Sequence, residues 1–249
     1  MNAEKAISMG FLGLVIALAP AVACNGAEPQ QRRERLKEAL DNKEVQVLLS
    51  GVGASSGVLL VMAIRSAISQ SLQIDVPSGT LLKSNDANPQ NMAIDEVKGR
   101  YDGPSPKDVL NACEDAANQL EKIQQLKDAV SRQYWNDAND IVLSPYSLRV
   151  YAVSAYCVDF EKDNPSTKTT FSVSPQQNQA LNRLFSYLAE HHDDYSVGSV
   201  QLATWAVSDN LSADTIRDKF PFDEPGREEA CRLLKRSDID SDTMTLCTQ

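Results

Sequence analysis

Short apolar runs separated by turn residues fill residues 44–101. Within these runs, apolar side chains either alternate with polar ones or follow one another directly, and both patterns are typical of β-strands. Gly, Pro and Asn stand between the runs, as expected of the turns that join strands. The predicted strands are residues 45–49, 58–64, 72–76, 80–83 and 92–97. Their spacing favours a β-sandwich.

A second pattern occupies residues 104–136. Apolar side chains recur there at helical spacing, and Asp, Glu, Lys and Gln fill the other positions. The apolar stripe contains Val109, Cys113, Ala116, Leu120, Ile123 and Val130. We therefore expect an amphipathic helix inserted between strands. Such a helix packs on its own domain or, as an alternative, mediates self-association as part of an assembly subunit.

Strands resume at residues 141–143, 148–160 and 169–173. Because both faces of 148–160 are apolar, we expect this strand at the centre of the sheet. The remainder is helical: Ser174, Pro175 and Gln177 are typical of a helix start. Residues 200–207 are apolar on nearly all sides, which predicts a buried helix, and Ser212 is a candidate helix cap.

The predicted fold class is α+β. A tether with a short helix covers residues 24–43, and a β-sandwich domain with the helical insertion 104–136 covers residues 44–173. A small helical domain covers residues 174–249.

Residues 1–23 have the organisation of a signal peptide. Lys5 lies in a short polar start, an apolar run follows, and Ala21-Val22-Ala23 are the small residues that precede a cleavage site. The run is shorter than the roughly 20 apolar residues that a membrane span needs. A Cys directly after the cut, here Cys24, resembles a bacterial lipoprotein signal, in which that Cys receives lipid. Plain secretion and a retained N-terminal anchor are the alternatives. We expect an exported protein of the cell envelope, anchored in the membrane through Cys24 or secreted.

The charge of the chain narrows the choice of partner. The formal net charge is −10 for 249 residues, and loss of residues 1–23 removes one Lys and one Glu, so it does not change. Nucleic-acid binders cluster Lys and Arg to neutralise phosphates, so we expect no nucleic-acid partner. A hydrophobic fraction of 42% is ample for a buried core.

Four cysteines remain after Cys24. In an oxidising compartment such an even set predicts disulfides. Cys231 and Cys247 are the most favourable pair because a short loop joins them. Cys113 and Cys157 are left, either paired with each other or unpaired.

Two short motifs carry the most specific chemistry. Tyr156-Cys157-Val158-Asp159 ends a predicted strand, and Val200-Gln201 opens an apolar helix that also holds Trp205. Together they resemble the two signatures of bacterial surface thioester domains. The resemblance implies that the Cys157 thiol and the Gln201 side chain condense into an internal thioester that acylates a nucleophile on a partner surface. The alternative is that Cys157 is a core residue and Gln201 pairs or caps at a helix start.

Three other patterns resemble functional motifs, but we expect each to have a purely structural role. His191-His192-Asp193-Asp194 lies at a helix end, where the two His rings point in different directions. Asp238, Asp240 and Asp242 resemble half a calcium loop that lacks its Gly. The glycine-rich stretch 51–57 is typical of a hairpin turn. We expect no metal, no cofactor and no catalytic set.

The sequence therefore predicts an exported, envelope-anchored protein that binds, adheres or assembles and is not an enzyme. Its partner would be a protein or a cell surface, with the membrane reached through lipid on Cys24. Covalent adhesion through a Cys157–Gln201 thioester is the alternative.

Overall fold

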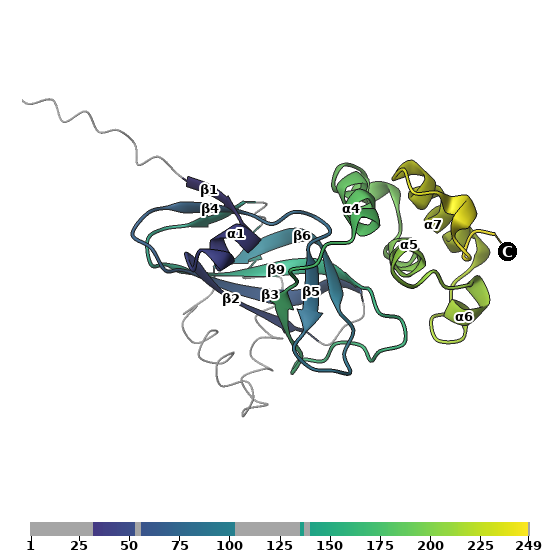
Figure 1. Ribbon diagram of the computed structural model, residues 1–249, viewed down its shortest axis with the longest axis horizontal. Helices are drawn as coiled ribbons and strands as arrows, with labels where there is room; N and C mark the ends of the chain where they lie inside the picture. The colour runs from purple at the N-terminus through teal and green to yellow at the C-terminus, as the bar shows by residue number, and fades with distance from the viewer. Residues whose placement is uncertain (1–31, 53–55, 103–134, 137–139, 249) are drawn as a thin grey trace, which may run out of the picture. The chain divides into compact units, whose positions relative to one another are not determined.

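Six antiparallel strands of the protein close into a barrel in the computed structural model (Figure 1). The structure describes residues 32–52, 56–102, 135–136 and 140–248. The predicted signal segment, Cys24, Cys113 and most of the predicted insertion lie outside these residues. The strands of the barrel are β2 (Val45–Gly51), β3 (Ser56–Ser66), β5 (Leu81–Ser84), β6 (Met92–Tyr101), β9 (Leu148–Cys157) and β10 (Thr170–Val173).

The order of the strands shows that the predicted β-sandwich is wrong. The order is β5-β10-β2-β3-β9-β6, and β5 pairs with β6 as well as with β10, which closes the sheet on itself. A sandwich needs two separate sheets with open edges, whereas closure pairs every edge. The α+β mixture of the prediction agrees with the structure, and β9 lies between β3 and β6 as a central strand.

Irregularities in the long strands allow the closure. The register of β6 on β9 shifts between Ile94 and Glu96 and again between Val97 and Gly99. The register of β3 on β9 shifts once as well. Each extra residue bends its strand and increases the local twist, as a strand at a barrel wall requires. β7 (Trp135–Asn136) pairs with β6, so the predicted insertion ends in a short strand.

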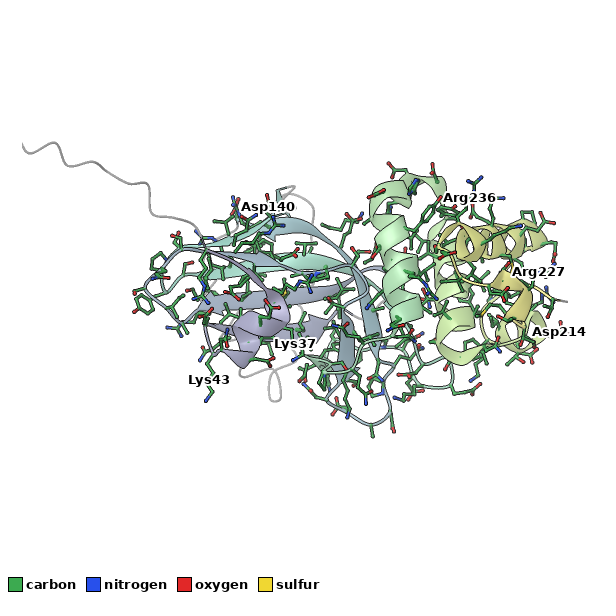
Figure 2. All side chains as sticks on the ribbon, turned by 45° about the horizontal axis from the view of Figure 1, so that its top comes forward. Lys37, Lys43, Asp140, Asp214, Arg227 and Arg236 are labelled. Carbon is green, nitrogen blue, oxygen red and sulfur yellow. A yellow bond between two sulfur atoms is a disulfide. The ribbon has the colours of Figure 1, made fainter. Side chains whose placement is uncertain are left out.

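A smaller mixed sheet contains the N-terminal part of the described chain. β1 (Arg32–Arg35) runs parallel to β4 (Leu72–Asp75), and β4 is antiparallel to β8 (Ile141–Leu143). α1 (Leu36–Asp41) follows β1 and buries Leu36 and Ala39. Residues predicted as a tether and short helix thus contribute to the core, while Lys37 of α1 carries its charge at the surface (Figure 2).

The C-terminal part is helical, and its helices continue the core of the barrel. α4 packs on β6, α5 on β9 and β3, and α7 on α5 (Figure 1). One connected set of buried apolar residues runs through strands and helices. The division into a β domain and a helical domain stays a prediction. The elements are α4 (Gln179–His191), η2 (His192–Asp194), α5 (Val197–Asp209), α6 (Ala213–Arg217), α7 (Glu224–Arg236) and η3 (Ser241–Thr243).

The helix starts follow local capping. α4 begins at Gln179, where the Asn178 side chain accepts from two backbone N–H groups, and not near Ser174 as predicted. The predicted cap Ser212 is confirmed, since its hydroxyl accepts from the Thr215 N–H at 3.2 Å. The predicted buried helix is α5. No helix in the described part of the chain is long and apolar enough to span a membrane.

The predicted disulfide between Cys231 and Cys247 is confirmed. It joins α7 to the C-terminal segment across a sequence separation of 16 residues. Arg227 of α7, labelled in Figure 2, adds a second link by donating to the Leu246 carbonyl at 3.0 Å. The bond therefore fastens the end of the chain to the helix on which that end packs.

Removing this disulfide should weaken the fold. We expect the double variant Cys231→Ser and Cys247→Ser to lower the free energy of unfolding by about 3 kcal/mol. The disulfide restricts the unfolded chain by closing a loop of this length, and the variant lacks that restriction. The melting temperature should fall by about 6–12 °C for a protein of this size. Reductant should shift the wild-type melting temperature by a similar amount and leave the double variant unchanged. An equal effect of reductant on both proteins would refute the assignment of stability to this bond.

Candidate functional site

The structure brings together the two residues that the sequence motifs singled out. The Cys157 N–H donates to Gln201 Oε1 at 3.1 Å, and Gln201 Nε2 donates to the Cys157 carbonyl at 2.8 Å. The two residues are 44 positions apart in the sequence, and both are fully buried. One carboxamide therefore satisfies both main-chain polar groups of one cysteine.

The ends of two elements create this contact. Cys157 is the last residue of β9, and the described pairing of β3 with β9 reaches only as far as Tyr156. Gln201 lies in the second turn of α5, whose start is fixed by the Ser196 hydroxyl accepting from the Ser199 N–H at 3.2 Å. The Gln201 amide thus supplies the donor and acceptor that a further strand would otherwise give Cys157.

The sulfur of Cys157 lies in apolar surroundings. It is 3.6 Å from Met92 Sδ. Burial, with a smaller contribution from the Asp159 carboxylate, raises the pKa of the Cys157 thiol to about 12. The thiol is therefore neutral at physiological pH, and bulk water is kept from this part of the core.

The stretch that follows Cys157 is held by hydrogen bonds on both sides. Asp159 Oδ2 accepts from the Asn91 N–H at 2.7 Å. The Phe160 N–H donates to Asp209 Oδ2 at 3.2 Å, and burial raises the pKa of the Asp209 carboxyl. The Phe160 ring meets the Trp205 ring edge to face, with centroids 5.0 Å apart. β9 and α5 are thereby locked together just beyond the Cys157–Gln201 contact.

A cleft opens beside this stretch. It has a volume of ≈ 350 Å³ and is lined in part by Asn91, Val158, Asp159, Ser208 and Asp209. Val158 directly follows Cys157, so the cleft lies next to the buried pair. Its lining carries charge of both signs: Asp159 and Asp209 lie there together with Lys83, and Lys162 Nζ pairs with Asp159 Oδ2 at 3.1 Å.

The buried thiol should resist alkylation in the folded protein. With a pKa of about 12, only about 10⁻⁴ of the Cys157 thiol is ionised at pH 8, and the thiolate is the reactive form. We expect no label from iodoacetamide on the Cys157 peptide after an hour at pH 8, as read by peptide mass mapping. Raising the pH to 9 should leave that result unchanged, since the folded pKa lies far above both values. Rapid labelling of the native protein at pH 8 would contradict this.

The other candidates from the sequence lie apart from the pair. His191 Nδ1 is 2.9 Å from the Tyr187 carbonyl oxygen, and its ring stacks on the Tyr187 ring, whereas His192 faces β6. The residues on β6 that His192 contacts, Asp95 and Glu96, were missed by the sequence analysis. Adjacent acids inside an apolar strand were the available signal.

The glycine-rich stretch joins antiparallel strands, as predicted for a hairpin, because β2 and β3 pair antiparallel on either side of it. Gly51 ends β2, and a Cβ there would lie 2.5 Å from the Ser166 carbonyl oxygen, so close backbone approach requires glycine. The Asp240 side chain accepts from the Asp242 N–H at 3.2 Å and caps η3. Comparison of the chain with protein-family models, with curated proteins and with solved structures finds no match.

Proposed function

We propose that the protein is an exported, envelope-anchored binding protein that attaches to its partner covalently through a Cys157–Gln201 thioester. The observation that carries this is the pairing of the Gln201 carboxamide with the main chain of Cys157. The pairing holds the amide carbon next to the residue whose sulfur would join it. It also polarises the amide, because the Cys157 N–H donates to the oxygen on which negative charge would develop.

The proposed chemistry has two balanced steps. In the first, the Cys157 sulfur bonds to the Gln201 Cδ, the thiol proton goes to the departing nitrogen, and ammonia leaves. In the second, an amine of the partner attacks the same carbon, an amide forms, and the proton returns to the sulfur as a thiol. Each molecule reacts once, so this is attachment and not turnover. Burial protects the thioester from hydrolysis until a partner reaches it.

The cleft gives the nucleophile of the partner a route to the pair, and an amine is the nucleophile that turns a thioester into a stable amide. Asp159 and Asp209 line the cleft beside Val158 and can receive the ammonium group of a lysine side chain in exchange for the Lys162 ammonium that now pairs with Asp159. The partner in this proposal is a protein or a cell surface that presents such amines.

Export is supported by two features. The disulfide Cys231–Cys247 belongs to the kind of bond that persists in oxidising compartments. Residues 1–23 have the pattern of an export signal, and Cys24 stands where a lipoprotein carries its lipid. Lipid on Cys24 would hold the protein at the membrane.

Amine capture tests the proposal. Native protein incubated with methylamine, which is small enough to reach a buried bond, should take up one amine per chain, and peptide mapping should place it on Gln201. Cys157→Ala should abolish labelling while keeping both main-chain hydrogen bonds with Gln201, so loss of label would not reflect loss of the contact. Gln70→Ala, at an exposed position that does not line the cleft, is the matched control and should label normally. Wild type that takes up no amine, or labels equally with and without the Cys157 sulfur, would refute the thioester.

Non-covalent binding, adhesion or assembly is the second candidate. The complete burial of Cys157 and its raised pKa favour this candidate, because both suit a structural thiol. In a non-covalent binding protein, the Gln201 amide would serve only as the hydrogen-bond partner of the Cys157 N–H and carbonyl at the end of β9. Failure of amine capture would select this function.

A further inference from the structure

Three side chains with metal-ligand chemistry meet where the end of α4 reaches β6. They are Asp95 and Glu96 of β6 and His192 of η2, at the end of α4. One ligand atom from each lies within 4.8 Å of the other two. His192 Nε2 is 3.0 Å from Asp95 Oδ2 and 3.5 Å from Glu96 Oε1. No other such group of His, Cys, Asp and Glu occurs among the described residues.

A strand irregularity explains how neighbouring residues reach the same point. Successive side chains of a regular strand point to opposite faces, so Asp95 and Glu96 could not both face His192. The register of β6 on β9 shifts at this place, since Ile94 pairs with Ala155 and Glu96 with Ser154, leaving Asp95 as the extra residue. Such a bulge re-aims side chains, and bulges occur often beside functional sites.

The Asp95 carboxylate of this cluster is buried. The residue is 2% exposed, and its Oδ2 accepts from the buried Ser154 hydroxyl at 3.1 Å. A cation bound beside this carboxylate would offset the cost of keeping its charge buried. The Ser154 hydroxyl fixes the orientation of the carboxylate, as groups behind metal ligands do.

The cluster is open on one side. The side chain of His192 is 32% exposed and that of Glu96 is 37% exposed, so an ion could enter from solvent and keep water ligands there. The Lys98 ammonium forms an ion pair with Glu96 from two residues along the strand. Lys98 is similarly exposed and flexible, so it can move away from Glu96 when a cation arrives.

We propose that Asp95, Glu96 and His192 bind one divalent transition-metal ion of the Zn²⁺ type. One imidazole and two carboxylates form a donor set that suits Zn²⁺, with a water completing four ligands. The ion would fasten the end of α4 to the barrel wall. This site is independent of the thioester proposal.

Titration of the chelator-stripped full chain with ZnCl₂ tests the site, with calorimetry for affinity and melting temperature as a second readout. We expect saturable binding of one ion and a rise in melting temperature. His192→Ala and Glu96→Gln should each weaken binding at least about ten-fold. Lys98→Met should tighten it several-fold by removing the competing ammonium.

His191→Ala is the matched control, because His191 contacts Tyr187 and not the cluster. It should leave the affinity for Zn²⁺ unchanged. Circular dichroism of each variant checks that the fold persists. Absence of saturable binding, or equal losses from His191→Ala and His192→Ala, would overturn the proposal. So would an affinity that is insensitive to Glu96→Gln.

Discussion

Replacing Gln201 by Ala is expected to lower the free energy of unfolding by about 3–5 kcal/mol and to abolish amine capture. The side chain is fully buried, so its removal leaves a cavity. It also leaves the Cys157 N–H and carbonyl without the partners they now have at 3.1 and 2.8 Å. Each unsatisfied buried group costs about 1–3 kcal/mol. Urea denaturation followed by circular dichroism measures the loss.

The matched control is Gln70→Ala, which truncates the same side chain at an exposed position away from the cleft and should change stability by less than about 0.5 kcal/mol. A loss below 1 kcal/mol for Gln201→Ala would show that the carboxamide contact does not support the fold. That result would also remove the basis for holding the amide beside Cys157.

Replacing Trp205 by Ala is expected to cost about 3–5 kcal/mol of unfolding free energy. The Trp205 ring meets Phe160 and Phe220 edge to face, with centroids 5.0 and 5.2 Å away. These contacts fasten the segment after Cys157 to α5. We also expect the variant to lose amine capture, because the water-excluding wall beside the pair would be opened.

The variant Trp205→Phe distinguishes the contribution of the aromatic ring contacts from that of the indole N–H group. Trp205 Nε1 is buried and has no hydrogen-bond acceptor among the described residues. Because no hydrogen bond is lost, the variant should be destabilised by only about 1 kcal/mol and should still capture amine. If Trp205→Phe were as damaging as Trp205→Ala, aromatic packing would not be the source of the stability.

Much of the secondary structure could be predicted from the chain itself. The strand periods located β2, β3, β4, β5, β6, β8, β9 and β10 within a few residues, because the half-buried wall of a sheet imposes alternation. Closure of the barrel could not be predicted. It depends on β5 pairing with both β10 and β6, and a four-residue strand carries no signal for two partners. The start of α4 was misplaced because Ser174 and Pro175 imitate a helix start that Asn178 provides.

The two sites differ in how far the sequence predicts them. Cys157 and Gln201 each sit in a distinctive local pattern, and the structure brings them together through the main chain of Cys157. The bond to the Cys157 sulfur stays a prediction. Asp95, Glu96 and His192 are joined by a strand bulge and by the docking of α4, both of which are tertiary features. No local pattern reports which side of β6 the end of α4 will reach.

Intact mass of the native, non-reduced protein tests the central claim most directly. Condensation of Cys157 with Gln201 predicts a mass about 17 Da below that expected from the sequence and the disulfide, because ammonia is lost. The deficit should vanish in Cys157→Ala and after treatment with methylamine. A mass lower only by the roughly 2 Da of each disulfide would contradict the thioester. The contact between Gln201 and Cys157 would then be structural.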